Sequence, residues 1–154
     1  MDVLQIGFGN GHLLPDLLGR AEGLNYVRID ISQTMIDEVR RFDASLVTSG
    51  QTTFHHAKAE ETPFLAASFD RVFAVNVIYF WSDALRQLKE IGGVLRPNGF
   101  RLIAATLETT SANPVTRPEF GFLARDETTL VVLHEEAGFS DLTVELFEEA
   151  APHL

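Results

Sequence analysis

The chain has 154 residues, of which 45% are apolar and 22% charged, and its formal net charge is −10. This length is typical of one domain, and the composition excludes a disordered chain, so we expect a single domain over residues 1–154. The 12 basic residues are scattered, whereas nucleic-acid binders cluster Lys and Arg against phosphates, so we expect no nucleic-acid substrate. The absence of cysteine excludes disulfides and thiolate metal sites and fits a reducing, cytoplasmic setting.

The sequence shows no membrane-targeting pattern. Its longest apolar run, Val72 to Trp81, is interrupted by Asn76 and covers about half of the roughly 20 residues that a bilayer requires. The amino terminus, Met1-Asp2, is acidic and lacks the features of a signal peptide. We therefore expect a cytoplasmic protein that does not bind membranes.

In the first third of the chain, short β-rich runs alternate with helical periodicity, which predicts a parallel sheet with helices on its faces. Strands are predicted at residues 3–6, 25–30 and 52–56, with a short helix at about 12–21. Ser32 can cap a second helix, whose apolar residues recur at helical spacing: Met35, Ile36, Val39, Phe42 and Leu46.

The alternation continues to the end of the chain. The predicted elements are a strand at 69–75, a helix capped by Ser82, a turn at 96–99, a strand at 100–106, a loop at 107–124, a helix from Asp126 to the C′ residue Gly138, and a sixth strand at 142–147. The strand at 69–75 is almost entirely apolar, as expected of a strand covered on both faces. The whole pattern indicates an α/β fold.

The first predicted strand runs into a glycine-rich segment, Gly7-Phe8-Gly9-Asn10-Gly11. Glycines in this pattern let the backbone turn sharply and let a ligand approach where a Cβ would clash. The dinucleotide fingerprint would require a further glycine at position 12, where this chain has His12. The spacing favours a ligand-binding loop and gives less support to a dinucleotide pyrophosphate.

A carboxylate follows at the end of the second predicted strand. Asp30 lies 19 residues after Gly11, at the edge of the sheet where open α/β folds bind ligands, and can accept hydrogen bonds from the ribose hydroxyls of an adenosine. Met35 lies one turn into the next helix and either covers an adenine face or packs in the core. No set of His, Asp and Glu residues has metal-ligand spacing, so we expect no metal site.

Five segments in the same order resemble the class I S-adenosylmethionine-dependent methyltransferases, particularly the small-molecule group similar to the ubiquinone and menaquinone methyltransferases. They are Val3–Gly11, which resembles V-L-[DE]-x-G-x-G-x-G; Ile29–Ile36, which resembles I-D-x-S-x-x-M-[IL]; Ala59–Asp70, which resembles A-E-x-L-P-F-x-x-x-S-F-D; Leu88–Gly99, which resembles L-x-E-[IA]-x-R-V-L-[RK]-P-G-G; and Glu136–Phe139, which resembles E-A-G-F. The resemblance implies a Rossmann-like three-layer sandwich with a mostly parallel sheet in the order 3-2-1-4-5, plus the C-terminal strand.

The resemblance also implies roles for the matching residues, with S-adenosyl-L-methionine as the cofactor. The implied cofactor-binding residues are Gln5, Gly7, Gly9, Gly11, Asp30, Ile31, Met35, Ala59, Glu60 and Asn76. Among them, Asp30 would hold the ribose and Asn76 would face the methionine amino group and the sulfonium. Tyr79 and Trp81 are acceptor-side candidates, with plain aromatic packing as the alternative, and for Phe80 packing is the expectation.

The chain departs from the family pattern at several places. Gln5 stands where the family has an acid that would pair with the cofactor's ammonium group, and Lys58 stands where a hydrogen-bond acceptor for adenine is common. Gly92-Gly93 stands where a helix with Arg is usual. Neither the helices that normally precede the first strand nor a seventh strand is evident. We therefore expect a solvent-open site and an uncovered sheet edge through which a homodimer could form.

Three functions remain open from the sequence. The first is methyl transfer to O, N or C of a small molecule, which we expect. The second is a catalytically degenerate module for binding or dimerisation, favoured by Gln5, Lys58 and the missing lid. The third is an NAD-dependent oxidoreductase, disfavoured by His12 and by the Ala59–Phe64 segment.

Overall fold

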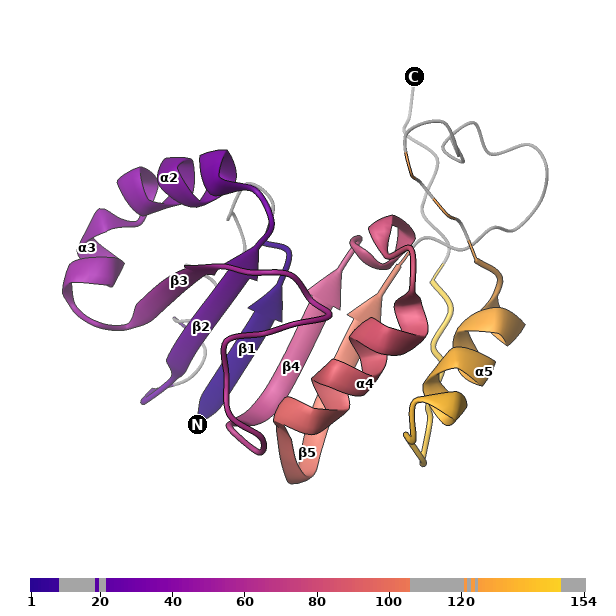
Figure 1. Ribbon diagram of the computed structural model, residues 1–154. Coiled ribbons are helices and arrows are strands. Elements are labelled where there is room, and N and C mark those ends of the chain that lie inside the picture. Colours follow the sequence, from indigo (N-terminus) through magenta and orange to yellow (C-terminus); the bar gives the residue numbers. More distant parts are fainter. Residues whose placement is uncertain (9–18, 20–21, 106–120, 122, 124, 148–154) are drawn as a thin grey trace.

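The computed structural model describes residues 1–8, 19, 22–105, 121, 123 and 125–147. Within them, five parallel strands form one sheet in the order β3-β2-β1-β4-β5 (Figure 1). The strands are β1 (Asp2–Ile6), β2 (Asn25–Asp30), β3 (Thr52–His56), β4 (Phe69–Val75) and β5 (Leu95–Ala104). The predicted α/β class and strand order are confirmed.

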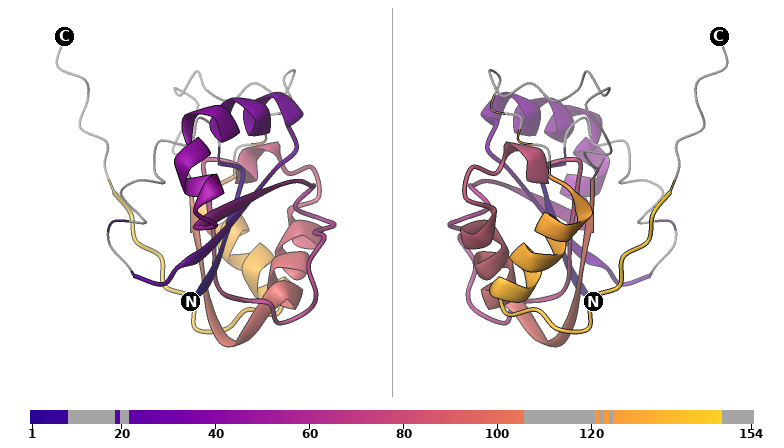
Figure 2. Two further views of the ribbon diagram at one scale, coloured as in Figure 1. Left: turned by 90° about the vertical axis from the view of Figure 1, so that its left-hand side faces the viewer. Right: turned by 90° about the vertical axis from the view of Figure 1, so that its right-hand side faces the viewer.

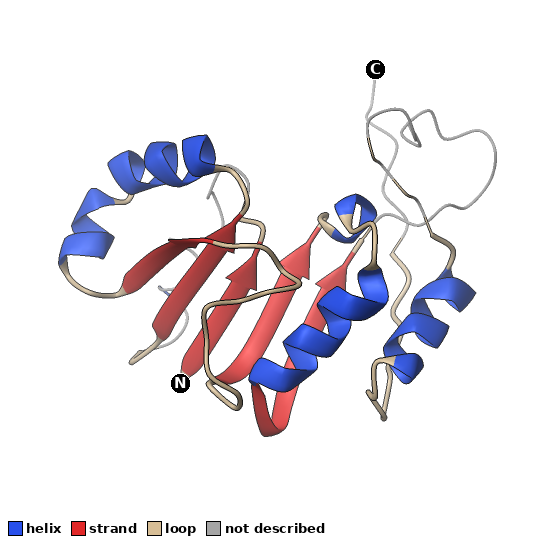
Figure 3. Ribbon diagram, in the orientation of Figure 1, coloured by secondary structure: helices blue, strands red, loops and turns tan. Residues whose placement is uncertain are grey.

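The described helices are α2 (Gln33–Phe42), α3 (Ala44–Thr48), the 3₁₀ turn η1 (Ile78–Phe80), α4 (Ala84–Val94) and α5 (Glu127–Glu136). α4 and α5 lie side by side over the β4–β5 half of the sheet, while α2 and α3 lie at the β2–β3 end (Figures 1 and 2). Because all the strands are parallel, their carboxyl ends meet at one edge of the sheet (Figure 3). No helix within the described ranges is long and apolar enough to cross a membrane.

Side-chain caps set where three helices begin. The Ser32 hydroxyl accepts a hydrogen bond from the Met35 N–H at 3.3 Å, and the Asp126 carboxylate accepts one from the Thr129 N–H at 2.7 Å, as predicted. The prediction that Ser82 caps α4 is wrong. Asp83 is the cap, and its carboxylate accepts from the Arg86 N–H at 3.1 Å.

The main core lies between the sheet and α4. Leu4 of β1, Ala74 of β4 and Leu88 of α4 have no exposed surface. The second predicted helix is divided at Asp43 into α2 and α3, and the expectation that Phe42 faces the core is wrong, since Phe42 is 84% exposed. The division places the Asp43 carboxylate 3.1 Å from the buried Arg28 guanidinium. The helical periodicity of the sequence does not predict this ion pair.

The prediction of a turn at residues 96–99 that precedes the strand is wrong, because β5 already begins at Leu95. These residues form an irregularity within the strand, where the register shifts between the Phe69–Leu95 and Arg71–Phe100 pairs and Asn98 has φ +63°. The predicted sixth strand at 142–147 is wrong. This segment has no strand pairing, and its apolar residues Val144, Leu146 and Phe147 are exposed. Its apolar alternation indicates a strand but does not supply a partner. After Gly138 and Asp141, which both have positive φ, the segment leaves α5 for the opposite side of the sheet (Figure 2).

Two predicted elements fall mostly outside the described residues, the helix at 12–21 and the loop at 107–124. The outer edge of β5 has no strand partner within the described part of the chain.

Candidate functional site

Three of the predicted site residues lie at the carboxyl ends of strands, at one edge of the sheet. Gly7 follows β1, Asp30 ends β2 and Asn76 follows β4. The chain order changes direction between β1 and β4, and ligands of open α/β sheets bind at this kind of switch point. The structure therefore brings these residues to the edge where the family's cofactor is expected.

Gly7 meets two backbone requirements at this edge. Its φ is +66°, which side-chain-bearing residues rarely adopt, and its N–H donates to the Ile29 carbonyl at 2.9 Å. A Cβ on Gly7 would also collide with Val77 just beyond β4. The glycine thus allows the ends of β1 and β4 to approach each other closely. Gly9 and Gly11 lie outside the described residues.

Asp30 is half-buried, and one of its two carboxylate oxygens accepts a hydrogen bond from the described part of the protein. Its Oδ1 accepts from the Ser32 N–H at 2.9 Å, and its carbonyl accepts from the Ala57 N–H at 3.0 Å. Within the described residues, no hydrogen bond is made by its second carboxylate oxygen. The neighbouring Ile31 is 69% exposed at the same edge. This geometry fits a ribose bound by Asp30, with an apolar side chain beside it.

Gln5 is engaged inside the protein. Only 2% of its surface is exposed, and its Oε1 accepts from the Tyr26 hydroxyl at 2.7 Å and from Arg28 Nε at 3.3 Å. Burial raises the pKa of the Tyr26 hydroxyl, which is the donor in this bond. The two donors come from β2 and hold the Gln5 carboxamide against the sheet, which leaves it poorly placed to accept from an ammonium group.

The loop after β3 is tied to α4. Ala59 is 5% exposed, and Glu60 Oε2 accepts from Gln87 Nε2 at 3.2 Å. Glu90 Oε1 accepts from both the N–H and the hydroxyl of Thr62, at 3.0 and 2.6 Å. These bonds tie the loop to α4. The last predicted contact, Met35, is half-buried and packs with the core cluster of α2 and β3.

The aromatic segment after β4 is arranged differently from expectation. Tyr79 and Trp81 are 4% and 6% exposed, whereas Phe80 is 58% exposed. The expected aromatic packing of Phe80 is present, with its ring edge-to-face against Tyr79 at a centroid distance of 6.1 Å, but it lies at the surface. The reason is the 3₁₀ turn η1, which directs neighbouring side chains to different sides. The Tyr79 hydroxyl donates to Asn76 Oδ1 at 2.6 Å, so this buried residue contacts a predicted cofactor-binding residue.

Sequence reasoning missed Arg125, whose guanidinium binds the η1 turn. Its Nη1 donates to the Ile78 carbonyl and its Nη2 to the Trp81 carbonyl, both at 2.7 Å. Burial lowers the pKa of Arg125. No local pattern could have identified this contact, because the acceptors are backbone carbonyls more than 40 residues away in the sequence.

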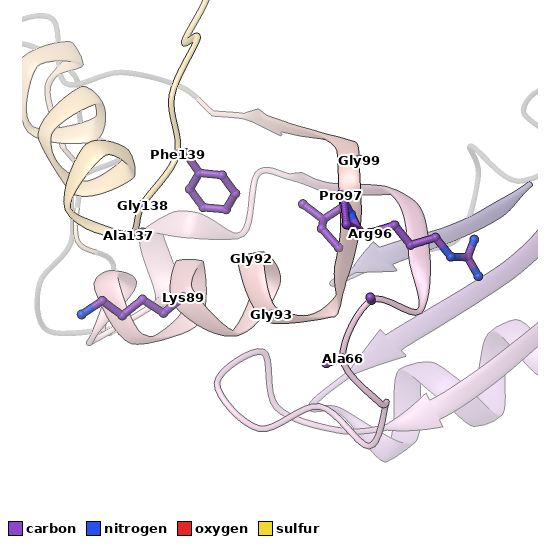
Figure 4. Close-up of a pocket in the computed structure, with 12 residues that line it drawn as sticks. Ala66, Lys89, Gly92, Gly93, Arg96, Pro97, Gly99, Ala137, Gly138 and Phe139 are labelled. Carbon is purple, nitrogen blue, oxygen red and sulfur yellow. The ribbon is translucent and has the colours of Figure 1, made fainter.

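A cavity of about 510 Å³ lies at the other end of the sheet, between the end of α4, the start of β5 and the end of α5 (Figure 4). Phe139 points toward Gly92, where an added Cβ would lie 3.4 Å from the Phe139 ring. The cavity contains none of the predicted site residues. It is therefore separate from the candidate cofactor site.

The parallel sheet, the glycine turn after β1 and the acid at the end of β2 define a Rossmann-like nucleotide-cofactor domain. The family model described as "Methyltransferase domain" matches residues 4–103. The chain belongs to this family, the class I S-adenosylmethionine-dependent methyltransferases, whose cofactor is S-adenosyl-L-methionine.

Individual relatives agree with this assignment. The chain is 26% identical over 152 residues to the uncharacterized methyltransferase YdaC of Bacillus subtilis (strain 168), covering 99% of this chain and 78% of that protein. It is 32% identical over 105 residues to the O-methyltransferase resE of Aspergillus sclerotiorum, covering 68% of this chain and 39% of that protein. A SAM-dependent methyltransferase from Aquifex aeolicus has the same fold, with a TM-score of 0.75 and 22% identity over 90% of this chain and 71% of that one.

Proposed function

We propose that this chain forms one cofactor-binding domain over residues 1–154 and transfers a methyl group from S-adenosyl-L-methionine to a small molecule. The observation that carries the proposal is the Asp30 carboxylate. One of its oxygens is held by the Ser32 N–H, and the other makes no hydrogen bond within the described residues, beside the glycine turn of Gly7. A carboxylate that is held in place through one oxygen and can still accept hydrogen bonds suits the two hydroxyls of a ribose.

Each residue at the edge has a defined part in this proposal. Asp30 accepts from the ribose, and the backbone at Gly7, Gly9 and Gly11 lies along the methionine part of the cofactor. The adenine is bordered by Ile31, Met35, Ala59 and Glu60, and the methionine end by Asn76. The bound cofactor supplies a methyl group on a positively charged sulfur, and the protein's task is to align the acceptor with it and to exclude water.

Gln5 has a weaker part than the family pattern implies. Gln5 carries no charge, and its Oε1 already accepts from Tyr26 and Arg28, so the cofactor's ammonium group has no carboxylate partner at this position. Asn76 Oδ1 retains acceptor capacity beyond the Tyr79 hydroxyl, since an amide oxygen has two lone pairs. We infer that Asn76, rather than Gln5, is the main polar contact at the methionine end.

The acceptor is proposed to be a small molecule with an apolar part. Support comes from the 58% exposed Phe80 just beyond Asn76, and from the name O-methyltransferase that the fungal relative carries. The chain spans only 39% of that relative, so its substrate is a guide to the acceptor class alone.

A catalytically degenerate module that dimerises is the second candidate. Two observations favour it, the internal engagement of Gln5 and the unpartnered outer edge of β5 within the described residues. Phe100 and Leu102 of this strand are 57% and 51% exposed and would be covered by a second copy. Sedimentation of the purified chain tests this association.

Calorimetric titration with S-adenosylmethionine, S-adenosylhomocysteine and NAD separates the candidates. Binding of both adenosyl compounds without NAD heat supports the proposal. NAD binding alone would indicate an oxidoreductase, and no heat from any of the three would indicate a degenerate module. Incubation with a radiolabelled cofactor and a panel of phenols, hydroquinones and amines then tests transfer itself.

The variant Asp30→Asn tests the residue that carries the proposal. It can keep the bond from the Ser32 N–H but replaces the second acceptor by a donor, and we expect a loss of about 1.5–3 kcal/mol, or roughly 10- to 150-fold, in cofactor affinity. Asp37→Asn is the matched control, since Asp37 is exposed on α2 and, among the described residues, its carboxylate accepts a hydrogen bond from Gln33 alone. Equal affinities of the two variants would remove Asp30 from the site.

A further inference from the structure

The η1 turn is held by the segment that leads into α5. Arg125 donates to the carbonyls of Ile78 and Trp81, each at 2.7 Å, and the Leu123 N–H donates to the Tyr79 carbonyl at 2.7 Å. Three carbonyls of a four-residue stretch are thus bonded to two residues from a distant part of the chain. Arg125 Nη1 is also 3.2 Å from the Leu123 carbonyl, which joins the two donors to each other.

This turn carries the groups that surround the methionine end of the candidate site. Tyr79 projects inward and donates its hydroxyl to Asn76 Oδ1 at 2.6 Å. Asn76 has φ +55°, a backbone conformation that is costly for a residue with a side chain unless its surroundings hold it. A shift of η1 would therefore move the Tyr79 hydroxyl and release the Asn76 amide.

Arginine suits this position for a physical reason. The planar guanidinium presents donors in a fixed fork, so one side chain can bind two carbonyls on either side of the turn. A lysine ammonium is a point donor at the end of a flexible stem and cannot hold both in the same geometry.

We propose that Arg125 is a positioning residue for cofactor binding. It fixes η1, and through Tyr79 it orients the Asn76 side chain toward the methionine end of S-adenosylmethionine. This inference rests on the proposed function, and it adds a residue outside the segment that matches the family model, which ends at residue 103.

The test compares Arg125→Lys with Arg86→Lys, which makes the same change at an exposed position on α4. The affinity for S-adenosylhomocysteine is measured by calorimetry, alone and combined with Tyr79→Phe. Far-UV circular dichroism and urea unfolding report on the fold. Trp81 is the only tryptophan of the chain and is 6% exposed, so its fluorescence and its quenching by acrylamide report on the turn itself.

If Arg125 positions Asn76, Arg125→Lys remains folded, Trp81 is more strongly quenched, and affinity falls about fivefold to tenfold, as expected for the loss of one ordinary hydrogen bond. Adding Tyr79→Phe then causes little further loss, because both changes act through Asn76. Arg86→Lys matches the wild type. Unchanged affinity in a folded Arg125→Lys protein, or full additivity with Tyr79→Phe, would overturn the proposal.

A merely structural role predicts a lower urea midpoint with wild-type affinity in the folded protein. Should Arg125→Lys fail to fold, Leu123→Pro removes the N–H that binds the Tyr79 carbonyl, while it also fixes φ and replaces the leucine side chain, and it should give the same changes at about twofold to threefold. If the wild type does not bind S-adenosylhomocysteine, both the proposed function and the positioning role are wrong. If the wild type binds it and the variants bind it equally well, only the positioning role is wrong.

Discussion

Val77 packs against the backbone of Gly7 so closely that a Cβ on Gly7 would overlap Val77 Cγ1. The contact joins the residue after β1 to the segment after β4, the two strands between which the chain changes direction. The glycine therefore serves packing between strands in addition to any ligand. Its φ of +66° adds a second, independent requirement for glycine.

The variant Gly7→Ala should combine both penalties. For alanine, the left-handed backbone conformation costs roughly 1–2 kcal/mol and the overlap with Val77 about 1–3 kcal/mol. We expect a fall of about 3 kcal/mol in the free energy of unfolding, measured by urea denaturation, and weaker cofactor binding. Gly23→Ala separates the terms, since Gly23 has φ +68° and open space at its Cβ position. Equal losses in the two variants would show that the overlap with Val77 is relieved.

Gln5 is expected to matter for stability through its two donors. Gln5→Leu leaves the Tyr26 hydroxyl and Arg28 Nε without an acceptor in the interior, which we expect to lower the free energy of unfolding by about 2–4 kcal/mol. Gln5→Glu keeps an acceptor for both donors beside the Arg28 cation and should lose less. Urea denaturation of the two variants at neutral pH measures the order, and a Leu variant as stable as the Glu variant contradicts it.

The sequence was sufficient for the strand order and for most of the local elements. The strands β1, β2, β3 and β4 lie where they were predicted, and Gly138 has the positive φ of a helix C′ residue. The errors occur where two adjacent residues both suit the same role, or where a segment forms a strand only if a partner strand is within reach. Ser82 and Asp83 are adjacent residues that both suit a cap, and the alternation at 142–147 does not indicate whether a partner strand is in reach.

The candidate site could be predicted only for residues at the carboxyl ends of strands. Gly7, Asp30 and Asn76 meet because parallel strands end at one edge, which follows from topology alone. The use of Gln5 by Tyr26 and Arg28 depends on side chains that face each other across β1 and β2, and sequence motifs do not contain that information. Arg125 binds carbonyl groups, which every residue has, so no residue type marks its target.

Acid should destabilise the protein by protonating an ion cluster at the amino-terminal edge of the sheet, where β1, β4 and β5 begin. Arg96 Nη1 lies 2.7 Å from Asp2 Oδ2 and 2.9 Å from Asp70 Oδ2. The pKa of Asp2 is lowered by the Asn25 side chain and by Arg96, and the pKa of Asp70 by the Asp2 N–H and by Arg96. Folded pKa values below the ordinary 3.8 contribute stability that is present above 3.8 and lost as pH falls through the folded values.

Urea unfolding as a function of pH tests this cluster with Arg96→Gln. We expect the wild type to lose stability below pH 4, and the variant to lose less over the same range because the two carboxyl groups are then held less strongly in the charged form. The variant should therefore be less stable than the wild type at neutral pH by that difference, which is small because the three side chains are about one-third exposed, and the two proteins should converge as pH falls. Parallel pH profiles of the two proteins would contradict the assignment.

A second pH effect is expected nearer to neutrality, from His134 on α5. Its Nδ1–H donates to the Leu130 carbonyl at 2.6 Å, and burial together with the nearby Arg101 lowers its pKa below the ordinary 6.5. The unfolded chain therefore binds more protons than the folded one just below pH 6.5, so stability should be complete above 6.5 and decline as pH falls through the lowered value. His134→Gln should flatten this decline between pH 7 and 5.

His55, whose pKa is lowered by burial and by Arg40, contributes in the same direction, so part of the slope remains until His55→Gln is added. A slope that neither substitution alters would show that both histidines take up protons equally in the folded and unfolded chains.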